Sequence, residues 1–205
     1  MTALKPEAWK PDDLIKAVAL AGAAVAFFIG LIQYRVNQRW KRAEWVAQEM
    51  KTLFADQLLQ AALFMIDWDN GELTKLFPGR GYEKCGKEIL ENHEINHALR
   101  YGSRAAGFSP LEAEIRSAFD HLFDGIDRFH SYFATGLVTA SDLRPYLAYW
   151  ARGICNPRTP ENRGYHLQTY MNAYGFDGAL RLLKHLARPR LGQRIANLLR
   201  RQRKN

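Results

Sequence analysis

The sequence predicts an all-α protein, in which an N-terminal transmembrane helix continues into a cytoplasmic helical bundle. An apolar stretch of membrane length covers residues 14–34, and the helical pattern then continues to Phe54 without a helix breaker. No later stretch shows the sustained period-two alternation of a β-strand. We therefore expect a short extracytoplasmic segment at residues 1–12, the transmembrane helix at 13–34, and a cytoplasmic all-helical domain at 35–205 that ends in a basic helix.

The apolar stretch has the length and composition of a membrane-spanning helix. Residues 17–32 contain no charged side chain, and Lys16 and Gln33 are the polar residues at its two ends. At about 1.5 Å per residue the stretch is roughly 30 Å long, the thickness of the hydrocarbon core of a bilayer. A cleaved signal peptide fits less well, because the basic cluster follows the apolar run and residues 11–13 have the character of a helix start.

The flanking charges predict the orientation of the span. On the amino side the lysines are diluted by Glu7, Asp12 and Asp13, whereas four basic residues follow the span within two helical turns. Because basic flanks stay in the cytoplasm, we expect the amino terminus outside and the domain inside, as in a bacterial inner membrane. We expect the basic cluster at the membrane surface, against anionic lipid. This cluster consists of Arg35, Arg39, Lys41 and Arg42.

Within the span, small residues recur every four positions and therefore lie on one helical face. Such a stripe lets a second helix approach closely, and it is typical of transmembrane helices that associate. The alternative is an alanine-rich anchor whose glycines share a phase by chance, and the sequence leaves both open. The stripe consists of Gly22, Ala26 and Gly30.

A second apolar stripe follows the span with a 4-3-4-3-4 spacing. It is shorter than the three to four heptads that predict a coiled coil, so we expect it to be buried against the chain's own domain. The stripe consists of Val36, Trp40, Ala43, Ala47, Met50 and Phe54.

Start and stop signals divide the rest of the chain into helices. The clearest start has Ser109 as N-cap, Pro110 in the first turn and Glu112 three residues later, which is a capping box. Asp56 is the expected cap of an earlier helix, and Gly175 ends a later one. The expected helices cover residues 56–68, 82–101, 110–135, 141–154, 160–175, 177–187 and 190–203.

The charge distribution and the cysteines indicate which partners and which chemistry the chain can have. The chain has 205 residues and a formal net charge of +8, and its basic excess gathers behind the span and at the carboxyl end. This distribution favours anionic lipid as the partner of both regions, and the absence of interleaved aromatic residues disfavours nucleic acid. In a reducing compartment Cys85 and Cys155 are expected to be free thiols. A nucleophilic pair of Cys155 with His166 or His185 has no local motif to support it.

A set of short motifs is distributed along this framework. The motifs are Tyr34-Arg35, Asn37, Trp40 to Trp45, Asp67-Trp68, Arg116, Phe119-Asp120, Phe123, Arg128, Gly136-Leu137 and Tyr149-Trp150. Together they resemble a bacterial family of uncharacterised single-pass membrane-anchored helical proteins, and Trp45 stands where such a family would be expected to have a phenylalanine. The resemblance covers most of the chain and implies the architecture above, but it implies no catalytic residues.

One motif has the spacing of a catalytic metal site. Residues 93–97 read HEINH, an HExxH motif that places His93 and His97 on one helical face to hold zinc, with Glu94 as general base. A zinc peptidase also needs a third ligand, which the next helix would supply. The candidates are Glu112, Glu114, Asp120, His121 and Asp124.

Three features of the sequence argue against this zinc site. Glu91 is charged where such enzymes usually have an uncharged side chain, and no strand pattern precedes the motif. On a helical wheel both histidines fall between Ile89 and Leu90, on the face expected to pack into the core. A structural metal held by Cys85, the two histidines and a further residue is a third hypothesis.

The sequence therefore favours a non-enzymatic, membrane-anchored cytoplasmic module without a cofactor. Its expected partners are the lipid bilayer, a second copy bound through the transmembrane helix, and an unknown protein. The alternative function is a membrane-bound zinc metallohydrolase, with zinc as cofactor, Glu94 as the catalytic residue, and His93 and His97 as metal ligands.

Overall fold

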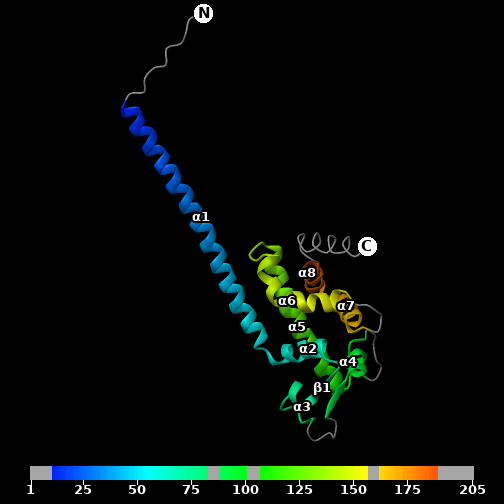
Figure 1. Ribbon diagram of the computed structural model, residues 1–205. Helices are drawn as coiled ribbons and strands as arrows, with labels where there is room; N and C mark the ends of the chain where they lie inside the picture. Colours follow the sequence, from blue (N-terminus) through cyan, green and yellow to red (C-terminus); the bar gives the residue numbers. More distant parts are fainter. Residues whose placement is uncertain (1–10, 83–87, 101–106, 157–161, 189–205) are drawn as a thin grey trace, which may run out of the picture. The chain divides into compact units, whose positions relative to one another are not determined.

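A computed structural model describes the chain at residues 11–82, 88–100, 107–156 and 162–188 (Figure 1). Most of the described residues are helical, and two short strands interrupt the helices. The elements are α1 (Pro11–Phe54), α2 (Gln57–Asp67), β1 (Asn70–Glu72), α3 (Leu73–Leu76), β2 (Ile89–Glu91), α4 (Asn92–Ala98), α5 (Pro110–Ala134), α6 (Ala140–Cys155), α7 (Arg163–Tyr174) and α8 (Asp177–Ala187).

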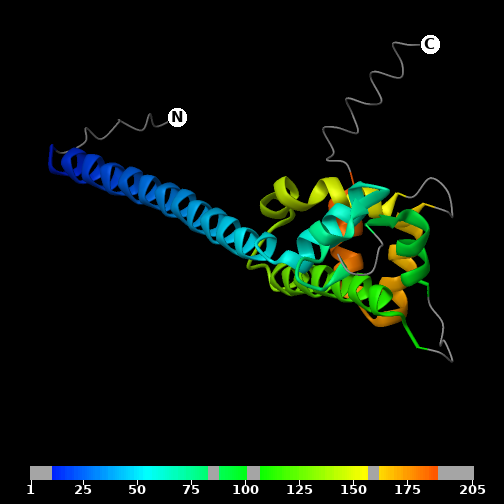
Figure 2. The same ribbon diagram turned by 90° about the horizontal axis from the view of Figure 1, so that it is seen from below.

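The chain divides into two compact units, residues 1–44 and residues 45–205, and α1 runs through the boundary between them. Figures 1 and 2 show α1 as one continuous helix. Among the described residues, this is the helix that is long and apolar enough to cross a membrane. None of the most apolar part of this helix is buried within the protein.

The helical domain, residues 45–205, is built around α5. This helix contacts α2, α4 and α8, while α6 contacts α7 and α8. The buried face of α5 is largely aromatic and aliphatic, with Phe119, Phe123 and Phe129 fully enclosed. Burial of such side chains is worth about 1.5–3 kcal/mol each relative to exposure, so this face supplies much of the stability of the domain.

The last three turns of α1 belong to this core, but in a different register from the predicted stripe. Val46, Met50 and Leu53 are buried, whereas Ala47 is exposed. Leu53 lies so close to Gly125 of α5 that a Cβ atom on the glycine would approach its Cδ1 to 2.4 Å. Of the predicted stripe within the domain, only Met50 and the half-buried Phe54 face inward. With Ala43 and Ala47 in the predicted stripe, that face of the helix is hardly more apolar than the neighbouring face with Val46, Met50 and Leu53. The second face is the one that packs into the core of the domain.

The prediction of an entirely helical chain is wrong at one place. β1 and β2 form an antiparallel two-stranded sheet, in which Gly71 pairs with Leu90. A Cβ atom at position 71 would lie 2.8 Å from both Phe64 and Leu76, so the close packing there requires glycine. Where the structure describes residues 88–100, the predicted helix is therefore replaced by the strand β2 and the short helix α4, and residues 83–87 and 101 lie outside the described part of the chain.

The predicted helix ends are largely confirmed. Asp56 caps α2 through a bond from the Leu59 amide to its Oδ1 at 2.9 Å. Ser109 and Glu112 form the predicted capping box of α5, with distances of 3.2 and 2.9 Å for its two hydrogen bonds. α7 ends at Gly175, which has φ of 82°. The start of the helix predicted at residues 160–175 is wrong, because Asn162 has extended backbone and caps the helix through a bond from the Gly164 amide, and α7 begins at Arg163. Residues 157–161 and the predicted helix at 190–203 lie outside the described residues.

Candidate functional site

The HExxH motif lies on α4, but its two histidines do not face the core. Ile95 and Ala98 are the buried residues of this helix, while the side chains of His93 and His97 are 75% and 50% exposed. The predicted core-facing position of the histidines is therefore wrong. It assumed one helix through Ile89 and Leu90, and the strand at residues 89–91 breaks that phase.

Each histidine of the motif pairs with a different carboxylate. Nδ1 of His93 is 3.0 Å from Glu91, and Nδ1 of His97 is 2.8 Å from Glu112. Glu94 takes part in the capping box of α4, where its Oε2 accepts a hydrogen bond from the Glu91 amide at 3.0 Å. Within the part of the chain that the structure describes, no three His, Cys, Asp or Glu side chains form a group that could hold a metal ion.

Of the five proposed third ligands, Glu112 is the one that contacts a histidine of the motif. The ion pairs and hydrogen bonds found for three of the others join different parts of the domain. Glu114 pairs with Arg80 at 3.3 Å, Asp120 accepts from the Tyr170 hydroxyl at 2.6 Å, and His121 lies 3.4 Å from Asp56.

The cysteines do not form an activated nucleophile among the described residues. Cys155 is a free thiol, as predicted, and burial raises its pKa to about 11. A nucleophilic cysteine needs the opposite shift, because the thiolate is the reactive form. Cys85, which the hypothesis of a structural metal requires, lies outside the described residues.

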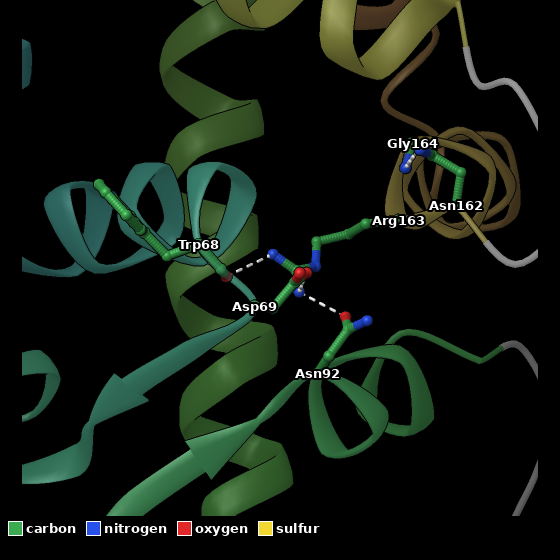
Figure 3. A network of polar contacts seen from close by, with 6 residues as sticks. All are labelled: Trp68, Asp69, Asn92, Asn162, Arg163 and Gly164. Atoms are coloured by element: carbon green, nitrogen blue, oxygen red, sulfur yellow. Dashed lines mark hydrogen bonds and ion pairs between the residues drawn. The ribbon is translucent and has the colours of Figure 1, made fainter.

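The polar centre of the domain is Arg163, at the start of α7 (Figure 3). Its side chain is 8% exposed, and its guanidinium reaches the end of α2 and the start of α4. Nη1 donates to the carbonyl of Trp68 at 2.8 Å, and Nη2 donates to Asn92 and lies 3.4 Å from Asp69. Burial lowers the pKa of Arg163, and the charge of Asp69 opposes that shift.

A second buried arginine joins α4, α5 and α7. Nη1 of Arg116 donates to the carbonyl of Ala98 at 2.8 Å, and the guanidinium lies 4.2 to 4.8 Å from the ring centres of three aromatic residues. Burial raises the pKa of the nearby Asp120, while its hydrogen bond from Tyr170 and the charge of Arg116 lower it. The three aromatic residues are Phe108, Tyr170 and Tyr174.

A group of exposed aromatic side chains lies on α2 and α6, and we call it the aromatic surface. Phe64 and Trp68 stack with ring centres 6.1 Å apart, and Tyr149 and Trp150 meet edge to face at 5.7 Å. Asp67 connects the two pairs, because its Oδ2 accepts a hydrogen bond from Nε1 of Trp150 at 3.2 Å. Figure 3 shows the Trp68 side chain pointing away from the buried guanidinium.

Exposure of these rings is substantial. Phe64, Trp68 and Tyr149 are 39%, 62% and 63% exposed. Phe64 also lines a groove of about 510 Å³ between α2, β1 and α3, whose rim carries the half-exposed Ile89. Exposed aromatic side chains are enriched at sites where a protein binds a partner.

The structure therefore offers two sites of different kinds, one polar on α4 and one aromatic on α2 and α6. The motifs Asp67-Trp68 and Tyr149-Trp150 lie far apart in the sequence, and nothing in the sequence predicts that they meet. The chain matches no protein-family model, no curated protein and no solved structure. The resemblance to a family of membrane-anchored helical proteins stays a prediction.

The Arg163 network generates a prediction about stability. Replacing Arg163 with Met should destabilise the helical domain by about 2–4 kcal/mol, because the Trp68 carbonyl and Asn92 lose a buried donor. Thermal unfolding of the full chain in detergent, followed by circular dichroism, would measure the change. Arg152→Met is the matched control, since Arg152 is exposed and donates within its own helix, and it should change stability by less than about 0.5 kcal/mol. Equal unfolding of the two variants would contradict the assigned role of Arg163.

Proposed function

We propose that the chain is a single-pass, membrane-anchored helical module that acts through protein contacts. The observation that carries this proposal is the course of α1. One helix without interruption contains an exposed apolar stretch long enough for a bilayer and then contributes Val46, Met50 and Leu53 to the core of the helical domain. Exposed apolar side chains of this kind are unfavourable in water. In a bilayer, lipid would cover them, and the backbone polar groups would stay satisfied by the hydrogen bonds of the helix.

The residues that follow the apolar stretch support a position at the membrane surface. Tyr34 and Trp40 are 62% and 72% exposed, and the basic cluster of residues 35–42 lies between and beside them. Aromatic residues with a polar edge settle at the headgroup level, and each basic residue near an anionic leaflet contributes about 1 kcal/mol. The excess of positive charge on the carboxyl side of the apolar stretch supports a cytoplasmic location for the domain, with the helix anchored in a bacterial inner membrane.

Membrane extraction and protease access test this proposal together. After expression in bacteria, we expect the full chain to remain with the membrane fraction through alkaline carbonate extraction. A tag at the carboxyl terminus should resist protease in spheroplasts and be cleaved in inverted vesicles, because the domain faces the cytoplasm. A soluble product that begins after the apolar stretch would instead identify α1 as a signal sequence and would contradict the proposal.

Small residues on α1 support self-association as part of this function. A Cβ atom added at Gly22 or Gly30 would meet nothing within 4 Å, so this face of the helix is open within the chain. With Ala26 between them, the two glycines would allow a second helix to approach closely in lipid. We propose that a second copy of the chain packs on this face.

Crosslinking in membranes tests the helix contact. Gly22→Ile and Gly30→Ile should each lower the yield of crosslinked dimer severalfold, because a branched side chain keeps the two backbones apart. Ala24→Ile is the matched control, since residue 24 lies on the opposite face of the helix and its substitution should leave the yield unchanged. Equal yields from all three variants would remove this face from the proposal.

A zinc metallohydrolase is the second candidate function, and one observation favours it. His93 and His97 both place Nδ1 against a carboxylate, which is how metal-ligating histidines are commonly oriented. A third donor is missing from the described residues around them, and Glu94 is engaged as a helix cap. The donor set that is described therefore does not fit a zinc site, and we derive no catalytic step from it.

Metal analysis separates the two candidate functions. The full chain, incubated with zinc in detergent and then desalted, should retain much less than one zinc per chain, because two histidines bind zinc weakly without further ligands. His93→Ala and His97→Ala should retain the same small amount. Stoichiometric zinc that is lost in both variants would instead favour the hydrolase.

A further inference from the structure

We propose that the aromatic surface of α2 and α6 binds the chain's own carboxyl-terminal segment, residues 189–205. The proposal concerns the helical domain alone, and it does not depend on the membrane anchor proposed above. The proposed occupant is one segment, whose composition is known from the sequence and which follows α8 in the chain.

The surface combines aromatic faces with negative charge. Trp68 lies between Asp67 and Asp69 in the chain, and the side chain of Asp69 is 83% exposed. Tyr149 adds a further ring next to Trp150, whose Nε1 donates to Asp67. A guanidinium binds favourably both over an aromatic face and against a carboxylate, so a surface of this composition suits an arginine-rich partner with interspersed apolar residues.

The rings are held in place before any partner arrives. Trp150 donates to Asp67 and packs against Phe54 with ring centres 5.8 Å apart. The backbone of Trp68 is fixed by the hydrogen bond from Arg163 to its carbonyl, and its ring stacks on Phe64. Because little side-chain freedom remains to be lost, binding costs less entropy here than on a mobile surface.

The carboxyl-terminal segment has the complementary composition. It contains six basic residues and no acidic residue. Its large apolar residues recur at helical spacing, so a helical conformation would give it an apolar face flanked by arginines. The basic residues are Arg190, Arg194, Arg200, Arg201, Arg203 and Lys204, and the apolar residues are Leu191, Ile195, Leu198 and Leu199.

The segment also begins beside α6, the helix that carries part of this surface. Nη1 of Arg144, on α6, donates to the carbonyl oxygens of Leu186 and Arg188 at 3.0 and 2.8 Å, so the described chain ends against this helix. Trp150 lies six residues further along the same helix, which is about 9 Å at 1.5 Å per residue. Residues 189–205 would cover about 25 Å as a helix and more when extended. The segment is therefore long enough to cross the surface, and its attachment gives it a high effective concentration there.

Site-specific photocrosslinking of the full chain in detergent tests the proposal. With Tyr149 replaced by p-benzoylphenylalanine, we expect irradiation to join position 149 to a peptide from residues 189–205, identified by mass spectrometry. A mixture of chains with normal and heavy nitrogen should yield crosslinks within one chain only. The same photoreactive residue at Ala113, which is exposed at the start of α5, is the control and should give no such product.

Charge reversal supplies the second arm of the test. Arg200→Glu combined with Arg201→Glu should reduce the crosslink at position 149 severalfold and raise hydroxyl-radical labelling of Trp68 to a similar degree, because like charges would then face Asp67 and Asp69. Circular dichroism checks that the variant is folded. Crosslinks between differently labelled chains would identify a second copy as the occupant and overturn the proposal. Crosslinks only to detergent or added anionic lipid, or unchanged labelling of Trp68, would overturn it as well.

Discussion

The arrangement of the helical domain depends on the buried guanidinium of Arg163. Taking an arginine out of water is costly, and the cost is offset only where its donors find well-placed acceptors. Here the acceptors come from the end of α2, the residue before β1 and the first turn of α4. The same side chain therefore fixes the helix that carries the HExxH motif and the backbone of Trp68 in the aromatic surface. Both candidate sites depend on one residue that belongs to neither.

Other polar side chains of the domain also serve to join helices. Oδ1 of Asp127 accepts a hydrogen bond from the amide of Ala179 at the start of α8, and Arg144 donates to the carbonyl groups at the end of that helix. Each charge has the sign that stabilises the helix end it contacts. A Cβ atom on Gly178 would lie 2.2 Å from Asp127, so the glycine permits the approach. In this way α8 receives its caps from α5 and α6.

The helix α1 combines two environments in one element. Its first part presents apolar side chains on every face, as a helix surrounded by lipid does, and its last three turns present one apolar stripe, as a helix packed on a domain does. Between these parts lie the exposed Tyr34 and Trp40 and the basic cluster, a combination that is typical of membrane interfaces. This order of surfaces along α1 is what supports the proposal of a single-pass, membrane-anchored module.

Local features of the sequence determined much of this structure. The length of the apolar stretch, the capping box at Ser109 and Glu112, the cap at Asp56 and the end of α7 at Gly175 all depend on residues within a few positions of one another. The presence of the HExxH motif could likewise be read from five neighbouring residues. Such features are visible in a sequence because the atoms that interact are close along the chain.

Only the tertiary structure decided the rest, because the partners are far apart in the chain. The hydrogen bond of Arg163 spans 95 residues, that of Trp150 to Asp67 spans 83, and that of Arg116 spans 18. The strand at residues 89–91 forms against Asn70–Glu72, and this pairing turned the histidines of α4 outward. The register of α1 likewise depends on a distant residue, because the absence of a side chain at Gly125 leaves room for Leu53. The sequence contains all of these residues, but no local pattern relates them, since only folding brings them together.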